Sequence, residues 1–201
     1  MNILIKQASI IDSKSPYNGK VMDVLIENGL IKSIKSKISS DKNVKVVDAE
    51  NLYLSTGWVD MQVSFCDPGF EHKEDLESGI KAAASGGYTG VAIVSSTNPS
   101  IHSKSEVLYI KNKTAGSIVD VHPIGTLSHK LEGQDISEMY DMQQAGAVAF
   151  SDDKKSIGNA GLLMRALLYA QNFGGLIITH CDEKSISNEG QMNEGITSTQ
   201  L

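Results

Sequence analysis

The sequence predicts an α/β fold in which strands and helices alternate, preceded by a small β-domain. Residues 1–55 hold short apolar runs separated by turn residues, whereas residues 56–201 alternate apolar strands with helical segments. Each helical segment ends at a glycine that directly precedes an apolar strand. These glycines recur at intervals of about 30 residues, at Gly86, Gly116, Gly146 and Gly174. Glycine suits this place because helices commonly end on a left-handed residue.

The first 55 residues predict the N-terminal part of a small β-sandwich-like domain. Asn28 and Gly29 lie between two apolar runs and predict the type I′ turn of a β-hairpin, because both residues tolerate positive φ. Residues 43–47 predict a further strand.

The repeat after residue 55 favours a (β/α)8 TIM barrel, because eight βα units of about 30 residues make about 250 residues. A doubly wound sheet is the alternative, but the G-x-G-x-x-G turn that usually follows its first strand is missing from the sequence. The chain therefore predicts about the first five βα units of a barrel, and we expect 201 residues to be a fragment. The expected strands are 57–65, 89–95, 119–126, 147–151 and 176–181.

The composition of the chain disfavours some classes of binding partner. The chain is 40% hydrophobic and 21% charged, with a formal net charge of -6 and a pI near 5.3. The sequence has no run of Lys or Arg longer than two, which disfavours nucleic-acid and membrane partners. The first ten residues do not resemble a leader peptide, so we expect a cytoplasmic protein. Cys66 and Cys181 are too few for a disulfide framework.

Polar residues collect where the expected strands end, and the loops at these ends form the active face of a βα barrel. This pattern predicts a site. The residues, in chain order, are Gln62, Ser64, Cys66 and Asp67; Ser95, Ser96 and Asn98; Thr126, Ser128 and His129; Ser151, Asp152 and Asp153; and His180, Asp182 and Glu183.

Several motifs together resemble the dihydroorotases of the cyclic amidohydrolase superfamily, in the form with an aspartate in place of a carboxylated lysine. They lie in register over nearly the whole chain, which makes the resemblance more specific than any single motif. The motifs are DPGFEHKEDLESG (67–79), AAASGGYTGV (82–91), STNP (96–99), GAVAFSDD (146–153), THCDE (179–183) and MNEG (192–195).

The resemblance implies a metal-dependent-hydrolase barrel beside a small β-domain. Such proteins use zinc to interconvert N-carbamoyl-aspartate and dihydroorotate in pyrimidine biosynthesis. Their first barrel strand carries His-x-His, whose period of two lets both imidazoles share one metal ion, followed by an arginine for the substrate carboxylate.

This chain departs from that pattern. Gln62 and Ser64 stand at the two histidine positions, and Cys66 stands at the arginine position. In the substrate-binding second loop, Ser96 replaces an expected asparagine, whereas Asn98 matches. Asp153 and His180 match metal-ligand positions, while further ligands and the general base would come from strands beyond residue 201.

The first interpretation is a pseudoenzyme with a degenerate zinc site. A catalytic zinc site usually has three protein ligands, and an amide or hydroxyl oxygen is a poor substitute for imidazole. We therefore predict no bound cofactor and assign no catalytic residue. Inactive relatives act as scaffolds for aspartate carbamoyltransferase, so the resemblance implies a similar structural partner. We also expect a homo-oligomer, because an exposed edge strand needs a partner.

The second interpretation is an active cyclic amidohydrolase, a dihydroorotase or hydantoinase-like enzyme, with a reduced zinc site. Asp153, His180 and residues beyond 201 would hold the metal. Cys66 as a nucleophile is less favoured than a simple loop thiol, because no histidine adjoins it to activate it. The other four histidines, His72, His102, His122 and His129, show no spacing typical of a metal site.

Overall fold

The structure is a computed structural model that describes residues 2–39, 43–187, 190, 192 and 195–200. Two residues of the MNEG motif, 193 and 194, lie outside this set. The chain divides into two compact units, Met1–Gly57 and Trp58–Leu201. Within the described residues, every helix is too short or too polar to span a bilayer.

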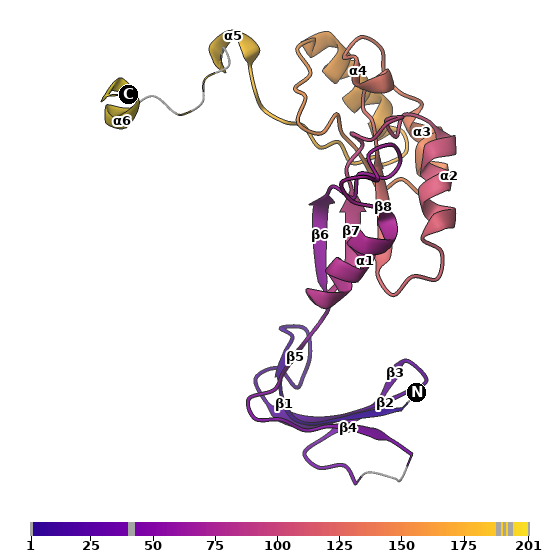
Figure 1. Ribbon diagram of the computed structural model, residues 1–201, viewed down its shortest axis with the longest axis vertical. Coiled ribbons are helices and arrows are strands. Elements are labelled where there is room, and N and C mark those ends of the chain that lie inside the picture. The colour runs from indigo at the N-terminus through magenta and orange to yellow at the C-terminus, as the bar shows by residue number, and fades with distance from the viewer. Residues whose placement is uncertain (1, 40–42, 188–189, 191, 193–194, 201) are drawn as a thin grey trace. The chain divides into compact units, whose positions relative to one another are not determined.

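The first unit is a five-stranded sheet (Figure 1). Its strands are β1 (Ile3–Ile11), β2 (Val21–Glu27), β3 (Leu30–Lys35), β4 (Lys45–Val47) and β5 (Tyr53–Ser55). β1, β2 and β3 are antiparallel neighbours, while β4 and β5 both pair with β1 in parallel. The predicted hairpin is confirmed: Asn28 and Gly29 join β2 to β3 with φ values of 52° and 79°.

Asp23 of β2 is a buried carboxylate. Its side chain accepts hydrogen bonds from the backbone N–H groups of Gln7 at 2.9 Å and Ile38 at 2.8 Å. Burial alone would raise the pKa of Asp23, but these hydrogen bonds outweigh it and hold the pKa below its ordinary value. The carboxylate therefore fastens β1 and the segment after β3 to β2.

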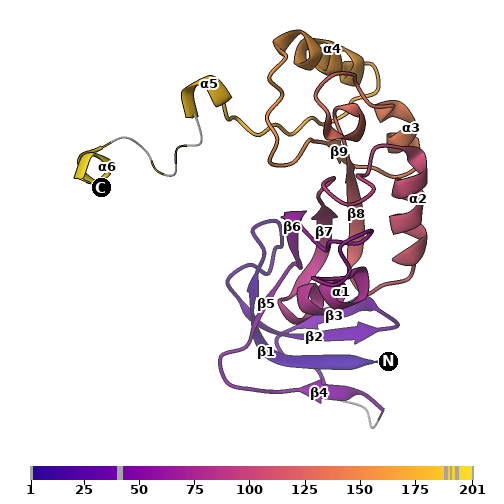
Figure 2. The same ribbon diagram turned by 45° about the horizontal axis from the view of Figure 1, so that its top comes forward.

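The second unit is a four-stranded parallel sheet in the order β6-β7-β8-β9 (Figure 2). The strands are β6 (Trp58–Val63), β7 (Tyr88–Ile93), β8 (Asp120–Gly125) and β9 (Ala149–Phe150). Four helices alternate with them: α1 (Leu76–Ser85), α2 (Lys104–Lys113), α3 (Met139–Gln144) and α4 (Ala160–Gln171). Shorter helical segments are η1 (His129–Leu131), α5 (Lys184–Ser187) and α6 (Ile196–Gln200).

The core of this unit lies between the sheet and its helices. α1 packs on β7 and α2 packs on β8. Fully buried side chains fill the space, which fixes the sheet and therefore the positions of the loops that follow it. Examples are Leu76, Ile93, Ile110, Leu127, Met142 and Phe150.

The glycine pattern is confirmed at three of its four positions. Gly116, Gly146 and Gly174 have φ values of 77°, 111° and 65°. The prediction was one residue early at the first helix, because Gly86 is still right-handed and Gly87 takes the positive φ of 82°. Either glycine ends the helix before β7, so the repeat is preserved.

The fifth predicted strand, 176–181, is largely wrong. Only Ile177 forms a parallel bridge, to Phe150, supported by the Ile178 N–H donating to the Phe150 carbonyl at 2.9 Å. Residues 179–181 are outside regular structure. His180 is therefore carried by a loop rather than by a strand.

Candidate functional site

The loops after β6, β7 and β9 bring the predicted site residues to one edge of the sheet. Asp153 lies at the centre of this group. Its Oδ1 accepts a 3.2 Å hydrogen bond from Gln62 Nε2, and its Oδ2 accepts a 2.6 Å hydrogen bond from Ser96 Oγ. The Asp153 N–H donates to Ser151 Oγ at 3.0 Å, and the residue has a positive φ of 54°. Three strand ends thus meet at one carboxylate.

A cavity of about 530 Å³ opens beside this carboxylate. Five of the predicted residues line it: Gln62, Ser64, Ser96, Asp152 and Asp153. Cys66 follows Ser64 by two residues in the loop after β6. Its Sγ lies 3.6 Å from Ser64 Oγ, and its backbone has a positive φ of 61°. The structure therefore brings predicted residues from distant parts of the sequence to one cavity.

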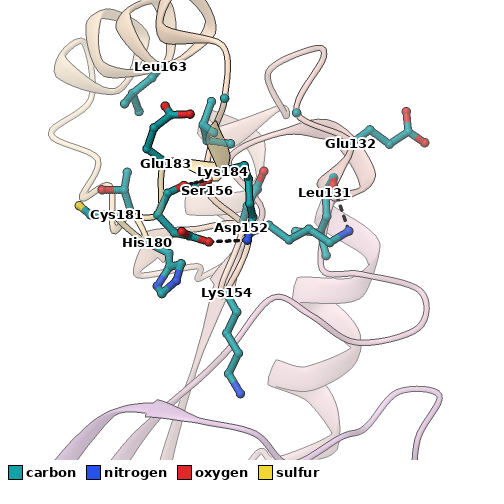
Figure 3. A pocket seen from close by; sticks show the side chains of 16 residues that line it. Leu131, Glu132, Asp152, Lys154, Ser156, Leu163, His180, Cys181, Glu183 and Lys184 are labelled. Atoms are coloured by element: carbon teal, nitrogen blue, oxygen red, sulfur yellow. Dashed lines mark hydrogen bonds and ion pairs between the residues drawn. The ribbon is translucent and has the colours of Figure 1, made fainter. Parts of the chain in front are cut away.

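His180 lies in a neighbouring cavity of about 670 Å³ (Figure 3). The two cavities share Leu131, Asp152, Lys154 and Lys155 as lining residues. In Figure 3 the side chains of His180 and Lys154 point to the same side of this cavity. Ser156 and Asp182 both line this cavity, and the Ser156 hydroxyl donates to the Asp182 carbonyl at 2.5 Å.

Asp152 holds the loop after β8 through hydrogen bonds. It is 4% exposed and accepts hydrogen bonds from the backbone N–H groups of Leu127 and Ser128, both at 2.9 Å, and from the Ser128 hydroxyl. Buried carboxylates need such donors. Asp152 therefore fixes the loop after β8, while its neighbour Asp153 faces the cavity.

Asn98 supports the first loop through its backbone. Its N–H donates to the Pro68 carbonyl at 3.0 Å. Gly69 sits so close that a Cβ there would lie 1.9 Å from the Asn98 carbonyl oxygen, and its φ is 97°. Only glycine fits this turn. Asn98 thus packs the loop rather than lining either cavity, as far as the described residues show.

Two residues that sequence reasoning missed anchor the same loop. Asp67 is fully buried and accepts hydrogen bonds from Tyr109 Oη at 2.9 Å and Lys113 Nζ at 2.7 Å. The hydrogen bond to Asp67 raises the pKa of Lys113 above its ordinary value. Tyr109 and Lys113 are four residues apart on α2 and so share a face, a spacing that was readable in the sequence.

Both hydrogen bonds to Asp153 come from uncharged side chains. A carboxylate only accepts hydrogen bonds, so Gln62 must turn its NH₂ group, not its carbonyl oxygen, toward Asp153. Both oxygens of Asp153 are thereby engaged by uncharged donors. Among the described residues, no group of three or more His, Cys, Asp or Glu side chains is placed to hold a metal ion.

The structure also joins two histidines that the sequence did not connect. His102, in the loop after β7, and His129, the first residue of η1, have ring centroids 5.0 Å apart in an edge-to-face arrangement. Their separation in sequence gave no signal of this contact, because it depends on β7 and β8 being neighbours in the sheet.

Comparison with known sequences agrees with the motifs. A family model described as dihydro-orotase-like matches residues 52–200. The dihydroorotase of Ruminiclostridium cellulolyticum is 41% identical over 202 aligned residues, which cover 100% of this chain and 47% of the relative. The dihydroorotase of Trichlorobacter lovleyi is 40% identical, with 100% and 47% coverage. The chain spans about half the length of these curated relatives.

Comparison with solved structures supports the fold. The L-hydantoinase (dihydropyrimidinase) of Arthrobacter aurescens superposes with a TM-score of 0.74 at 21% identity, covering 93% of this chain and 42% of that one. A D-hydantoinase gives a TM-score of 0.70 at 24% identity, with 94% and 42% coverage. The predicted fold, part of an amidohydrolase TIM barrel with a small β-domain, is confirmed.

Proposed function

Because this chain belongs to the dihydroorotase-like family, we propose that it keeps the fold of that family without its reaction. The reaction that the resemblance implies is the reversible cyclisation of N-carbamoyl-aspartate to dihydroorotate. In this proposal the protein is a structural partner of an aspartate carbamoyltransferase.

The hydrogen-bonded state of Asp153 carries the proposal. Gln62 and Ser96 donate to its two oxygens, so a side chain suited to bind a cation is instead satisfied by an amide and a hydroxyl. A zinc ion at this place would gain no imidazole from positions 62 and 64, where an amide and a hydroxyl stand instead.

The residue expected to bind the substrate carboxylate also supports the loss of the reaction. A guanidinium group binds a carboxylate through two parallel hydrogen bonds, and a thiol offers nothing equivalent. Cys66 stands where the resemblance implies that arginine, and its Sγ lies near Ser64 Oγ. A substrate with a carboxylate would therefore meet neither the arginine that binds this group nor the zinc ion.

The contacts that shape the loops are intact. Asp67 is fastened to Tyr109 and Lys113, and Gly69 is packed on Asn98. These contacts preserve the form of the domain but perform no chemistry. Their presence beside the altered cavity supports a role that needs the shape of the protein, which is what binding to another protein requires.

Metal analysis tests the loss of the zinc site. The purified protein is incubated with zinc, dialysed and analysed beside its His180→Ala variant. We expect the same zinc content in both. Stoichiometric zinc that disappears in His180→Ala would contradict the proposal and support the rival, an active cyclic amidohydrolase whose metal is held by Asp153 and His180.

Gel filtration tests the partnership. The protein is mixed with the aspartate carbamoyltransferase of its own source organism and compared with each component alone. We expect the two proteins to elute together at a larger size. Separate elution at micromolar concentrations would exclude a stable complex and leave only the loss of activity to be explained.

A further inference from the structure

The loops that carry His102 and His129 are joined by backbone hydrogen bonds. The Thr126 N–H donates to the Ile101 carbonyl at 2.8 Å, which ties the loop after β7 to the end of β8. The His129 N–H donates to the Asp135 carbonyl at 2.8 Å, which fixes the start of η1. The two rings are therefore held close by the backbone of two adjacent βα units.

The orientation of His102 is typical of a histidine that binds a metal. Its Nδ1 lies 2.7 Å from the Ser100 carbonyl oxygen, which only accepts, so Nδ1 is the donor and Nε2 is the nitrogen left to bind a metal. Glu106 Oε2 is 3.8 Å from the same Nδ1. Metal-binding histidines usually donate their other ring N–H to a carbonyl or carboxylate, which fixes the tautomer.

Access to the pair is open on one side. The side chain of His102 is 17% exposed, whereas His129 is exposed at the surface. Neither residue lines the two cavities beside Asp153, as far as the described part of the chain shows. A ligand at the pair would thus bind apart from the altered zinc position.

We propose that His102 and His129 together bind a divalent transition metal that favours imidazole, such as Ni²⁺ or Cu²⁺, with water at the remaining positions. Imidazole nitrogen suits these ions, and their affinity for a given nitrogen site exceeds that of Mn²⁺ or Fe²⁺. With two protein ligands the site is exchangeable, unlike a structural zinc site with four.

Histidine NMR signals test the proposal residue by residue. Ni²⁺ is added in small steps to the untagged protein, and the imidazole signals of its five histidines are followed. Ni²⁺ is paramagnetic and broadens the signals of the residues it binds. We expect His102 and His129 to broaden together, at lower Ni²⁺ than His72, His122 and His180.

Single variants separate joint binding from two independent weak sites. In His129→Asn, we expect the Ni²⁺ concentration that half-broadens His102 to rise at least about tenfold, because the second ligand no longer acts at a high effective concentration. His122→Asn is the matched control and should leave His102 unchanged. Unchanged spectra elsewhere show that the fold is intact.

Two results would overturn the inference. One is a His102 response in His129→Asn equal to that of the unsubstituted protein. The other is broadening of His102 and His129 no earlier than that of His72. Both results are independent of the Asp153 cavity, because the proposed function is tested through His180-dependent zinc.

Discussion

Ser96 Oγ donates a 2.6 Å hydrogen bond to Asp153 Oδ2, joining the loop after β7 to the loop after β9. With the 3.2 Å hydrogen bond from Gln62 at the end of β6, this contact closes a polar link across three strand ends. The link is made of an amide, a hydroxyl and a carboxylate. It supports our proposal that internal hydrogen bonding takes the place of metal binding here.

This link should contribute to stability. Ser96→Ala removes a partly buried hydrogen bond to a carboxylate, so we expect the free energy of unfolding to fall by about 1–2 kcal/mol. Urea unfolding followed by the fluorescence of Trp58, the single tryptophan, reports on this unit. Ser64→Ala is the matched control, since Ser64 lines the same cavity and its hydroxyl contacts Cys66 Sγ rather than Asp153. Equal losses in the two variants would contradict a special role for the link.

The hydrogen bonds of Asp67 with Tyr109 and Lys113 should contribute more to the stability of the fold than an exposed ion pair does. Lys113→Met leaves a fully buried carboxylate with Tyr109 as its remaining side-chain donor, so we expect a loss of about 2 kcal/mol, moderated because Lys113 is half-exposed. Lys81→Met is the control, because its pair with Glu77 is exposed on both sides. Thermal unfolding of both variants is the measurement, and a Lys81→Met shift as large as that of Lys113→Met would count against the anchor.

The pKa of Lys113 also sets a pH dependence. A folded-state pKa raised above the ordinary 10.5 contributes stability that is fully present below 10.5 and is lost as pH rises through the folded value. Lys113→Met should therefore lose its disadvantage relative to the unsubstituted protein only at strongly alkaline pH. Unfolding curves of both proteins at neutral pH and at increasing alkalinity check this, and a difference that vanished at neutral pH would be contrary to it.

Asp23 should act in the opposite pH range. Its folded-state pKa lies below the ordinary 3.8, so its contribution is present above that value and is lost as pH falls through the folded value. We expect Asp23→Asn to lower the hydrogen-exchange protection of β1 and β2 amides at neutral pH. The difference should shrink in acid below about pH 3.8. A difference that grew with acidity would reverse the assigned sign.

The sequence predicted features that depend on local pattern. The Asn28–Gly29 hairpin and the alternation of strands and helices follow from residues close in sequence. The fifth strand was overpredicted, since an apolar run at 176–181 forms only one bridge when the neighbouring β9 is two residues long.

For the candidate site, the sequence predicted which residues lie at strand ends but not the contacts between them. The positions of Gln62, Ser96 and Asp153 at strand ends were readable from the repeat, whereas their mutual hydrogen bonds needed the register of three parallel strands. The contact between His102 and His129 depends in the same way on which strands are neighbours. Such contacts between distant loops leave no periodic trace in a single sequence.

The cyclisation assay is the most direct test of the central claim that this protein has lost the family reaction. The purified protein, with zinc added, is incubated with N-carbamoyl-aspartate, and the dihydroorotase of Ruminiclostridium cellulolyticum is assayed in parallel. We predict formation of dihydroorotate at the rate of buffer alone. A rate well above buffer that is abolished in Asp153→Asn would contradict the account.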